Sequence, residues 1–424
     1  MMGSSELITK LFLQLFVILL TCRCVTVIGK RFLGQTQVVC EMAVGIVLGP
    51  SFLGLIAPTF QTYLFPNTQL VLENGASILH PSMSILHALS QLGLVIYLFL
   101  IGLDFDMTPV KKRFTSTLLI SATGILSPLL LGILITPLIY QIPNLFSSHV
   151  SLPNAALFLG SAISITAFPM LARIIYEHKL MKTSFGALAL SAGALDDAIV
   201  WLLLAGILAF FNQKPMMFIV TLVGAVAYIL FFIYLGQKKL SQLFSNEKRQ
   251  QHQLFYVLLI LICCAWLTDA IGIYAIFGSF LAGLNMPKDK AFITKIRNAL
   301  EPITINLLLP LFFVYSGLNT QLSLINSFLL ILVTLFIILV ACLGKGLACT
   351  LAAKYAGETW KNASLIGILM NARGLMELII LNIGLEHHLI TPTLFSMLVM
   401  MAIITTFIAS PLFHYLCHGA LYEK

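Results

Sequence analysis

Ala187–Phe211 reads ALALSAGALDDAIVWLLLAGILAFF, an apolar stretch interrupted by two adjacent aspartates, Asp196 and Asp197. A helix rises about 1.5 Å per residue, so this stretch is long enough to cross a bilayer. A carboxylate at that depth costs about 3 kcal/mol on insertion scales, and two neighbouring carboxylates also repel each other. The pair therefore indicates a site for a cation or a proton. A buried arginine or lysine that neutralises the pair for packing alone is the alternative.

The rest of the chain shares this apolar character. Its 424 residues are 59% hydrophobic and 9% charged, whereas soluble proteins carry about 25% charged residues. This composition predicts a polytopic, all-α membrane protein. The net charge of +8 does not indicate nucleic-acid binding, because the basic residues lie in short loops between apolar segments. No nucleophile–base set or metal-ligand cluster is evident, so we expect neither an enzyme nor a cofactor.

The apolar segments predict thirteen transmembrane helices. They span residues 7–29, 35–49, 84–104, 114–141, 152–178, 185–211, 216–235, 252–268, 271–286, 302–318, 326–353, 362–384 and 393–416. The loops predicted on one side carry eighteen lysines and arginines, and the other side has only Lys10 and Lys214. This positive-inside pattern predicts an external N-terminus and a cytoplasmic C-terminus, which requires an odd number of spans.

A third buried charge, Lys345, lies in the segment ILVACLGKGLACTLAA between two glycines. Small neighbours let another helix approach closely. A buried lysine needs a carboxylate partner or must lose its proton, so Asp196 or Asp197 is the expected partner. A lysine that extends its side chain to the cytoplasmic surface is the alternative.

Two predicted spans contain helix-breaking or polar residues. The fifth includes SAISITAFPMLARI, with Pro169, and the twelfth includes GILMNARGLMELIILNIG. They hold matching places in spans 1–6 and 8–13, and the odd offset of seven spans predicts two inverted repeats. Paired interrupted helices indicate a transporter site near the membrane midplane. An ordinary proline kink is the alternative for Pro169.

The twelfth span carries Asn371, Arg373, Gly374 and Glu377. Unwound backbone at membrane depth must line a cavity or be buried in protein. We therefore expect these residues, with Pro169, to support broken helices that cross near the aspartates. Arg373 and Glu377 are also placed to form an i, i+4 ion pair.

Several segments together resemble the bacterial monovalent cation:proton antiporters of family 2, the Kef and Nap-type branch. They are QVVCEMAVGIVLGPSFLG, LFLIGLDFD, SITAFPMLARI, ALDDAIVW, LLPLFFVYSGL, the Lys345 segment and NARGLMELIILNIG. They occur in the expected order over nearly the whole chain. The resemblance implies a homodimer in the cell inner (plasma) membrane that exchanges Na+ or K+ for protons.

The resemblance also implies a division of each chain into two parts. A dimerisation domain would comprise residues 7–106 and 252–320. A transport core would comprise residues 114–211 and 326–418, and a linker helix, residues 216–235, would join the two parts.

In the family pattern, the second aspartate is the principal cation ligand, here Asp197. The first, Asp196, pairs with the core lysine, here Lys345, and Thr166 faces the ion. An aspartate pair resembles the electrogenic members, and the implied mechanism is elevator-like alternating access. A cation channel, or a sensor or scaffold that kept the fold without transport, is the alternative.

Overall fold

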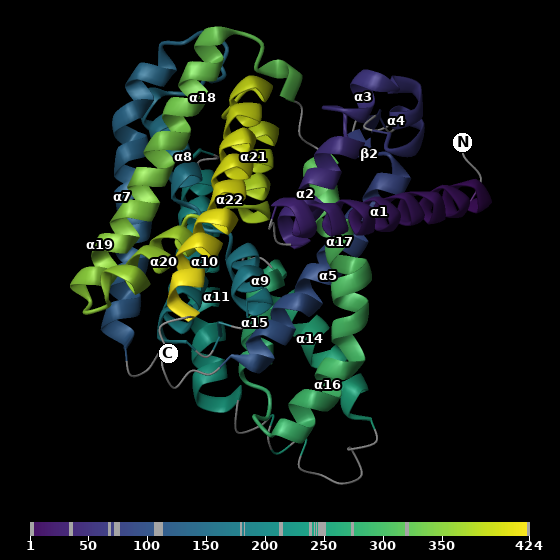
Figure 1. Cartoon of the computed structure of the whole chain (residues 1–424), viewed down its shortest axis with the longest axis vertical. Coiled ribbons are helices and arrows are strands. Elements are labelled where there is room, and N and C mark those ends of the chain that lie inside the picture. The colour runs from purple at the N-terminus through teal and green to yellow at the C-terminus, as the bar shows by residue number, and fades with distance from the viewer. Residues whose placement is uncertain are drawn as a thin grey trace. The chain divides into compact units, whose positions relative to one another are not determined.

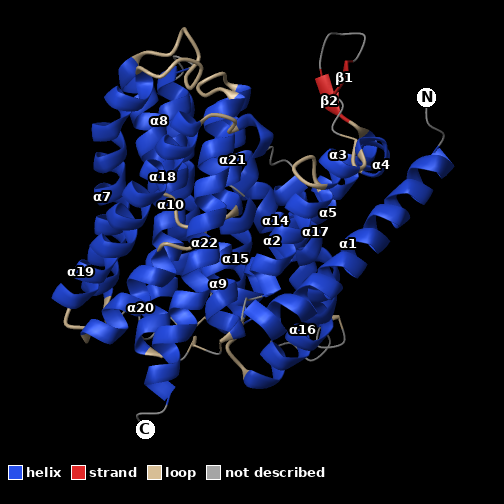
Figure 2. Ribbon diagram, turned by 45° about the horizontal axis from the view of Figure 1, so that its top comes forward, coloured by secondary structure: helices blue, strands red, loops and turns tan. Residues whose placement is uncertain are grey.

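The computed structural model describes the chain except residues 1–3, 34–36, 67–68, 72–76, 106–112, 179, 182, 212–214, 237–239, 241, 243, 245–251, 273–274, 319–321 and 422–424. The described part is almost entirely helical (Figure 1). One antiparallel pair of short strands, β1 (Gln69–Val71) and β2 (Ser77–Leu79), aligns Gln69 with Leu79 (Figure 2). The predicted helical membrane fold is therefore confirmed.

Contacts divide the chain into two compact units. The first comprises Met1–Tyr97 and Arg297–Ser323, and the division falls inside two helices, α5 (Pro81–Asp104) and α16 (Lys290–Ile303). Its other elements, besides the strands, are α1 (Ser4–Leu33), α2 (Gln37–Leu48), α3 (Leu53–Ile56), α4 (Pro58–Leu64), the π-helical segment η2 (Thr304–Leu308), α17 (Leu309–Leu318) and the start of the 3-10 helix η3 (Leu322–Leu324).

Close backbone packing holds part of the first unit together. A Cβ added to Gly45 of α2 would lie 2.4 Å from the carbonyl oxygen of Val314 and 2.8 Å from the Cα of Gly317, both on α17. Only residues without a side chain allow two helices to approach so closely. Ile18 of α1 and Leu86 of α5 are fully buried in the apolar cluster beside this contact.

The second unit comprises Leu98–Ile296 and Leu324–Lys424. It contains α7 (Phe114–Tyr140), α8 (Leu152–Ser164), α9 (Phe168–Glu177), α10 (Ser184–Phe211), α11 (Pro215–Phe231), the π-helical η1 (Phe232–Gly236), α14 (Gln253–Ala270), α15 (Ala275–Leu284), α18 (Phe328–Ala341), the π-helical η4 (Cys342–Leu347), α19 (Ala348–Tyr355), α20 (Trp360–Met370), α21 (Leu375–Glu386) and α22 (Pro392–Leu421). The aspartate-bearing helix α10 packs against α7, α8, α9 and α20.

Each of the thirteen predicted spans overlaps helical residues. Seven helices in the described part are long and apolar enough to cross a membrane by length and composition alone. Others, such as α8 and α15, are shorter apolar helices. A multi-pass protein is therefore confirmed, whereas the count of thirteen is not. The division into dimerisation and transport domains stays a prediction.

Candidate ion-binding site

The two aspartates lie on α10 within the second unit, and both side chains are buried, Asp196 at 0% and Asp197 at 6% exposure. Successive residues on an α-helix point about 100° apart, because a turn takes about 3.6 residues. The two carboxylates consequently meet different surroundings. Asp196 contacts polar groups from other helices, and Asp197 lines an apolar pocket.

Asp196 forms an ion pair with Lys345. The lysine Nζ lies 3.1 Å from Asp196 Oδ2, and both side chains are completely buried. The Thr166 hydroxyl donates a hydrogen bond of 2.7 Å to the same oxygen. Lys345 also donates to the backbone carbonyl of Gly124, at 3.0 Å, and to that of Ser164. The buried lysine is thus surrounded by acceptors and does not extend to the surface.

The helix that carries Lys345 is locally distorted. Lys345 lies in η4, a π-helical segment between α18 and α19, and such segments occur often at functional sites. Gly344 beside it lies against α7, since a Cβ there would be 3.1 Å from the Cα of Pro128. The predicted role of small neighbours is therefore seen at Gly344, where the absence of a side chain brings Lys345 close to α7.

The first interrupted helix breaks next to the aspartates. Helix α8 ends at Ser164, and α9 begins at Phe168 with Pro169 as its second residue. Proline is favoured in the first turn of a helix, because a backbone N–H there would have no partner within the helix. Thr166 within the break reaches Asp196, and the backbone N–H of Phe168 reaches the Asp197 carboxylate.

The second interrupted helix breaks between Met370 of α20 and Leu375 of α21. The two breaks touch, because the backbone N–H of Ala167 donates a hydrogen bond of 3.2 Å to the carbonyl of Ala372. A Cβ on Gly374 would lie 3.3 Å from the Cβ of Ala167. The structure thus brings together the two segments that the sequence marked as interrupted.

Arg373 links the second break to the first broken helix. Its guanidinium donates to the carbonyls of Ala162, at 3.4 Å, and Ile163, near the C-terminus of α8. Such carbonyls have no partner within their own helix. The expected contact with Glu377 is loose, at 3.7 Å between Arg373 Nη1 and Glu377 Oε2, although both side chains are fully buried. Capping of α8 is therefore the main polar role of Arg373 that the geometry reveals.

Other contacts at the second break were not predicted from the sequence. The Thr406 hydroxyl of α22 accepts from the backbone N–H of Arg373, at 2.9 Å, and donates to its carbonyl, at 2.6 Å. Asn371 donates to the sulfur of Cys342, at 3.3 Å, so it joins α20 to η4. Thr406 is one of several hydroxyl residues on an apolar helix, and no local pattern distinguishes it.

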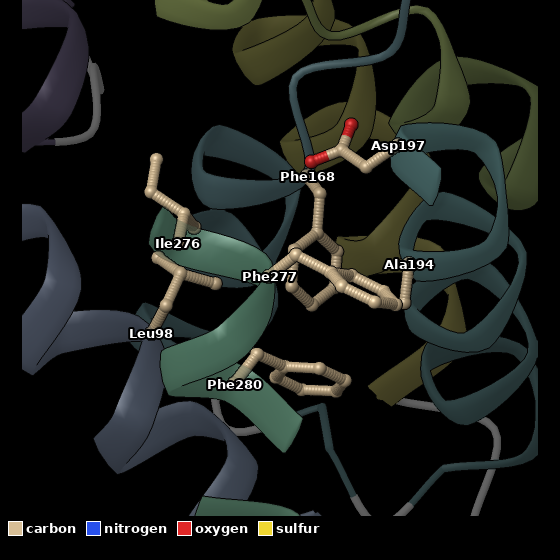
Figure 3. A pocket seen from close by; sticks show the side chains of 7 residues that line it. All are labelled: Leu98, Phe168, Ala194, Asp197, Ile276, Phe277 and Phe280. Carbon is tan, nitrogen blue, oxygen red and sulfur yellow. The ribbon is translucent and has the colours of Figure 1, made fainter. Parts of the chain in front are cut away.

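Asp197 opens onto a pocket that is otherwise apolar (Figure 3). The pocket is lined by Asp197 and by Leu98, Phe168, Ala194, Ile276, Phe277 and Phe280. The Asp197 carboxylate and the Phe280 ring lie at opposite ends of the pocket in Figure 3. Phe168 and Phe280 pack edge to face, with ring centroids 5.1 Å apart. The surroundings of Asp197 are therefore much less polar than those of Asp196.

Residues 16–418 match the family described as sodium/hydrogen exchanger, transmembrane. The chain is 36% identical over 409 residues to the Na(+)/H(+) antiporter NhaS4 of Synechocystis, covering 94% of this chain and 95% of the relative. It is 30% identical over 421 residues to K(+)/H(+) antiporter 1 of Saccharomyces cerevisiae, covering 97% of this chain and 46% of the relative. The chain thus spans about half the length of the yeast protein.

The fold is similar to that of a solved structure, the sodium proton antiporter MjNhaP1 from Methanocaldococcus jannaschii. The TM-score is 0.66 with 15% sequence identity, covering 99% of both chains. Together with the sequence match over residues 16–418, these similarities define the class. The chain belongs to the transmembrane sodium/hydrogen exchanger family.

Proposed function

We propose that the protein is a secondary active antiporter that exchanges Na+ or K+ for protons across a membrane. The observation that carries this proposal is the charge balance on α10. Lys345 neutralises Asp196, whereas Asp197 has no ion pair among the side chains that the structure describes. A buried carboxylate needs a counter-charge or a proton. We infer that Asp197 binds a cation and a proton alternately, and that each of them neutralises the carboxylate while it is bound.

The names of the relatives support the choice of ions. NhaS4 is named as a Na(+)/H(+) antiporter, and the yeast relative as a K(+)/H(+) antiporter. Carboxylate, hydroxyl and carbonyl oxygens are the ligands that hard cations prefer. Asp197, Asp196 and Thr166 supply such oxygens, and Asp196 Oδ1 has no hydrogen-bond partner among the described residues.

The mechanism that fits this chemistry is competition followed by movement. Deprotonated Asp197 binds a dehydrated cation, and protonation releases it. The unit that carries the site then moves only when the site is neutralised by the cation or by protons, as in elevator-like alternating access. If Lys345 also gives up its proton when the cation binds, two protons exchange for each cation. Each exchange cycle would then move one net charge across the membrane, which changes the free energy of the cycle by about 2.3 kcal/mol per 100 mV of membrane potential.

The assembly and placement belong to the same proposal. Two chains would associate through residues 7–106 and 252–320, with residues 114–211 and 326–418 as the moving parts and residues 216–235 as the link. The membrane would be the plasma membrane, with the N-terminus outside and the C-terminus in the cytoplasm, as the basic loops favour. Labelling of cysteines placed at either end, from each side of the membrane, tests this orientation.

Proteoliposomes with an imposed pH gradient test the transport function. Addition of Na+ or K+ should dissipate the gradient at a rate that saturates with cation concentration. A cation channel, in contrast, would carry cation current without a proton gradient and would not couple the two fluxes. Failure of both cations to move protons in the purified, folded protein would contradict antiport and favour a sensor or scaffold.

A further inference from the structure

The ammonium group of Lys345 is satisfied completely by acceptors from three different helices. An ammonium carries three donor protons. Lys345 Nζ has three acceptors, namely Asp196 Oδ2 at 3.1 Å, the Gly124 carbonyl at 3.0 Å and the Ser164 carbonyl. Only the first acceptor is charged. The other two are backbone carbonyls, one inside α7 and one at the last residue of α8.

The sequence explains why these two carbonyls are free to accept. In an α-helix, a carbonyl accepts from the N–H four residues later. For Gly124 that residue is Pro128, inside α7, which has no N–H. For Ser164 it is Phe168, but α8 ends at Ser164, and the Phe168 N–H faces the Thr166 carbonyl, at 3.2 Å, and the Asp197 carboxylate instead. A proline four residues later thus frees the Gly124 carbonyl, and the end of α8 frees the Ser164 carbonyl.

We propose that Pro128 is a positioning residue of the exchange site. It leaves the Gly124 carbonyl without its helical donor, and this carbonyl then anchors the Lys345 ammonium beside Asp196. While Lys345 keeps its proton, the Gly124 and Ser164 carbonyls continue to bind the ammonium when a cation draws Asp196 away from it. The inference rests on the proposed antiport, because it assigns Pro128 a part in cation binding.

Packing is the rival explanation for Pro128. Gly344 of η4 lies directly against it, since a Cβ on Gly344 would be 3.2 Å from the Pro128 Cβ. A packing role depends on side-chain size, whereas the role proposed here depends only on the missing N–H. Valine keeps most of the bulk of proline and restores the N–H. Alanine restores the N–H and loses the bulk, so the two variants separate the explanations.

The test measures the apparent KM for Na+ and the maximal exchange rate in proteoliposomes. Pro128→Val and Pro128→Ala should raise the apparent KM by similar factors of about tenfold, the effect of losing one hydrogen bond to a charged group. The maximal rate should change less. Pro137→Ala is the matched control, because Pro137 is the other proline inside α7 and its side chain is exposed. Its KM should equal that of the wild type.

A KM unchanged in Pro128→Val, or an effect seen in Pro128→Ala alone, would overturn the inference in favour of packing. Absence of Na+-coupled and K+-coupled proton flux in the wild type would instead contradict the proposed function. If both Pro128 variants are too unstable to reconstitute, the loss of thermal stability caused by Pro128→Val is measured in detergent in two backgrounds, the wild type and Asp196→Asn with Lys345→Met, which removes the ammonium without leaving a charge unpaired. A smaller loss in the second background supports the role of the carbonyl, and an equal loss contradicts it.

Discussion

At the scale of single residues, the site depends on a difference between two neighbours. Asp196 is paired with Lys345 and receives a hydrogen bond from Thr166, whereas Asp197 faces apolar side chains. The sequence identified both aspartates as buried charges because they interrupt an apolar segment. The residues alone left open which of them meets Lys345, since that choice depends on the rotation of α10 against a helix 149 residues away.

The ion pair between Asp196 and Lys345 should be visible in stability measurements. Removal of one partner leaves the other as an uncompensated charge, which costs about 3–5 kcal/mol when fully buried. Asp196→Ala and Lys345→Ala should therefore each lower the thermal unfolding temperature of the purified protein. The double variant should lose less than the sum of the two losses. Additive losses would rule out direct coupling between the side chains.

At the scale of secondary-structure elements, the sequence located both interruptions but did not reveal how their polar groups are satisfied. Pro169 and the Asn371–Gly374 segment marked the breaks, because proline and glycine end helices. The actual partners are distant in sequence: Arg373 caps α8, and Thr406 bonds the backbone of Arg373. Such contacts follow from the packing of whole helices, so no local pattern contains them.

Thr406 should therefore matter more than its neighbour on α22. Thr406→Val removes both hydrogen bonds to the Arg373 backbone, each with a net value of about 1 kcal/mol, so the variant should unfold at lower temperature and exchange more slowly. Thr405→Val is the control: Thr405 is equally buried, but its hydroxyl donates only to carbonyls of its own helix, Met401 and Ala402. Equal effects in the two variants would show that Thr406 does not support the break.

A second polar cluster joins three elements of the same unit near the ends of the predicted spans. Glu358, between α19 and α20, forms an ion pair with Arg113 at the start of α7. It also accepts from Ser184 of α10, at 3.2 Å, and from Asn362 of α20, at 3.0 Å. Burial by itself raises the pKa of Glu358, but the hydrogen bonds from Asn362, Arg113 and Ser184, together with the charge of Arg113, outweigh it and hold the pKa below its usual value.

This cluster predicts a pH-dependent contribution to stability. Because the pKa of Glu358 is lower in the folded protein, its carboxylate stabilises the fold fully above the ordinary pKa of about 4.3, and this stabilisation is lost as the pH falls through the folded value. Glu358→Gln should therefore unfold at a lower temperature than the wild type at pH 7. The difference should shrink below about pH 4. A difference that stays constant down to pH 3 would contradict the contribution of the charge.

At the scale of the whole molecule, the long apolar segments and the charges within them sufficed to predict a helical, multi-pass protein with two interrupted helices. The number of spans could not be fixed in the same way. Short helices such as α8 and α15 do not cross a bilayer by their own length, and π-helical segments such as η2 and η4 change the register within longer ones. These features depend on contacts between helices, as at Gly45 and Gly344.

The central claim is that Asp197 binds the exchanged cation and proton. Lys345 neutralises Asp196, so Asp197 is the aspartate of the pair that is left without a counter-charge among the described side chains. The most direct measurement is proton flux driven by Na+ or K+ in proteoliposomes that contain wild-type protein or Asp197→Asn. The wild type should show saturable, cation-dependent proton movement. Asp197→Asn should show none, although it purifies as a folded protein with the elution profile of the wild type. Cation-dependent proton flux at the wild-type rate in Asp197→Asn would contradict the account.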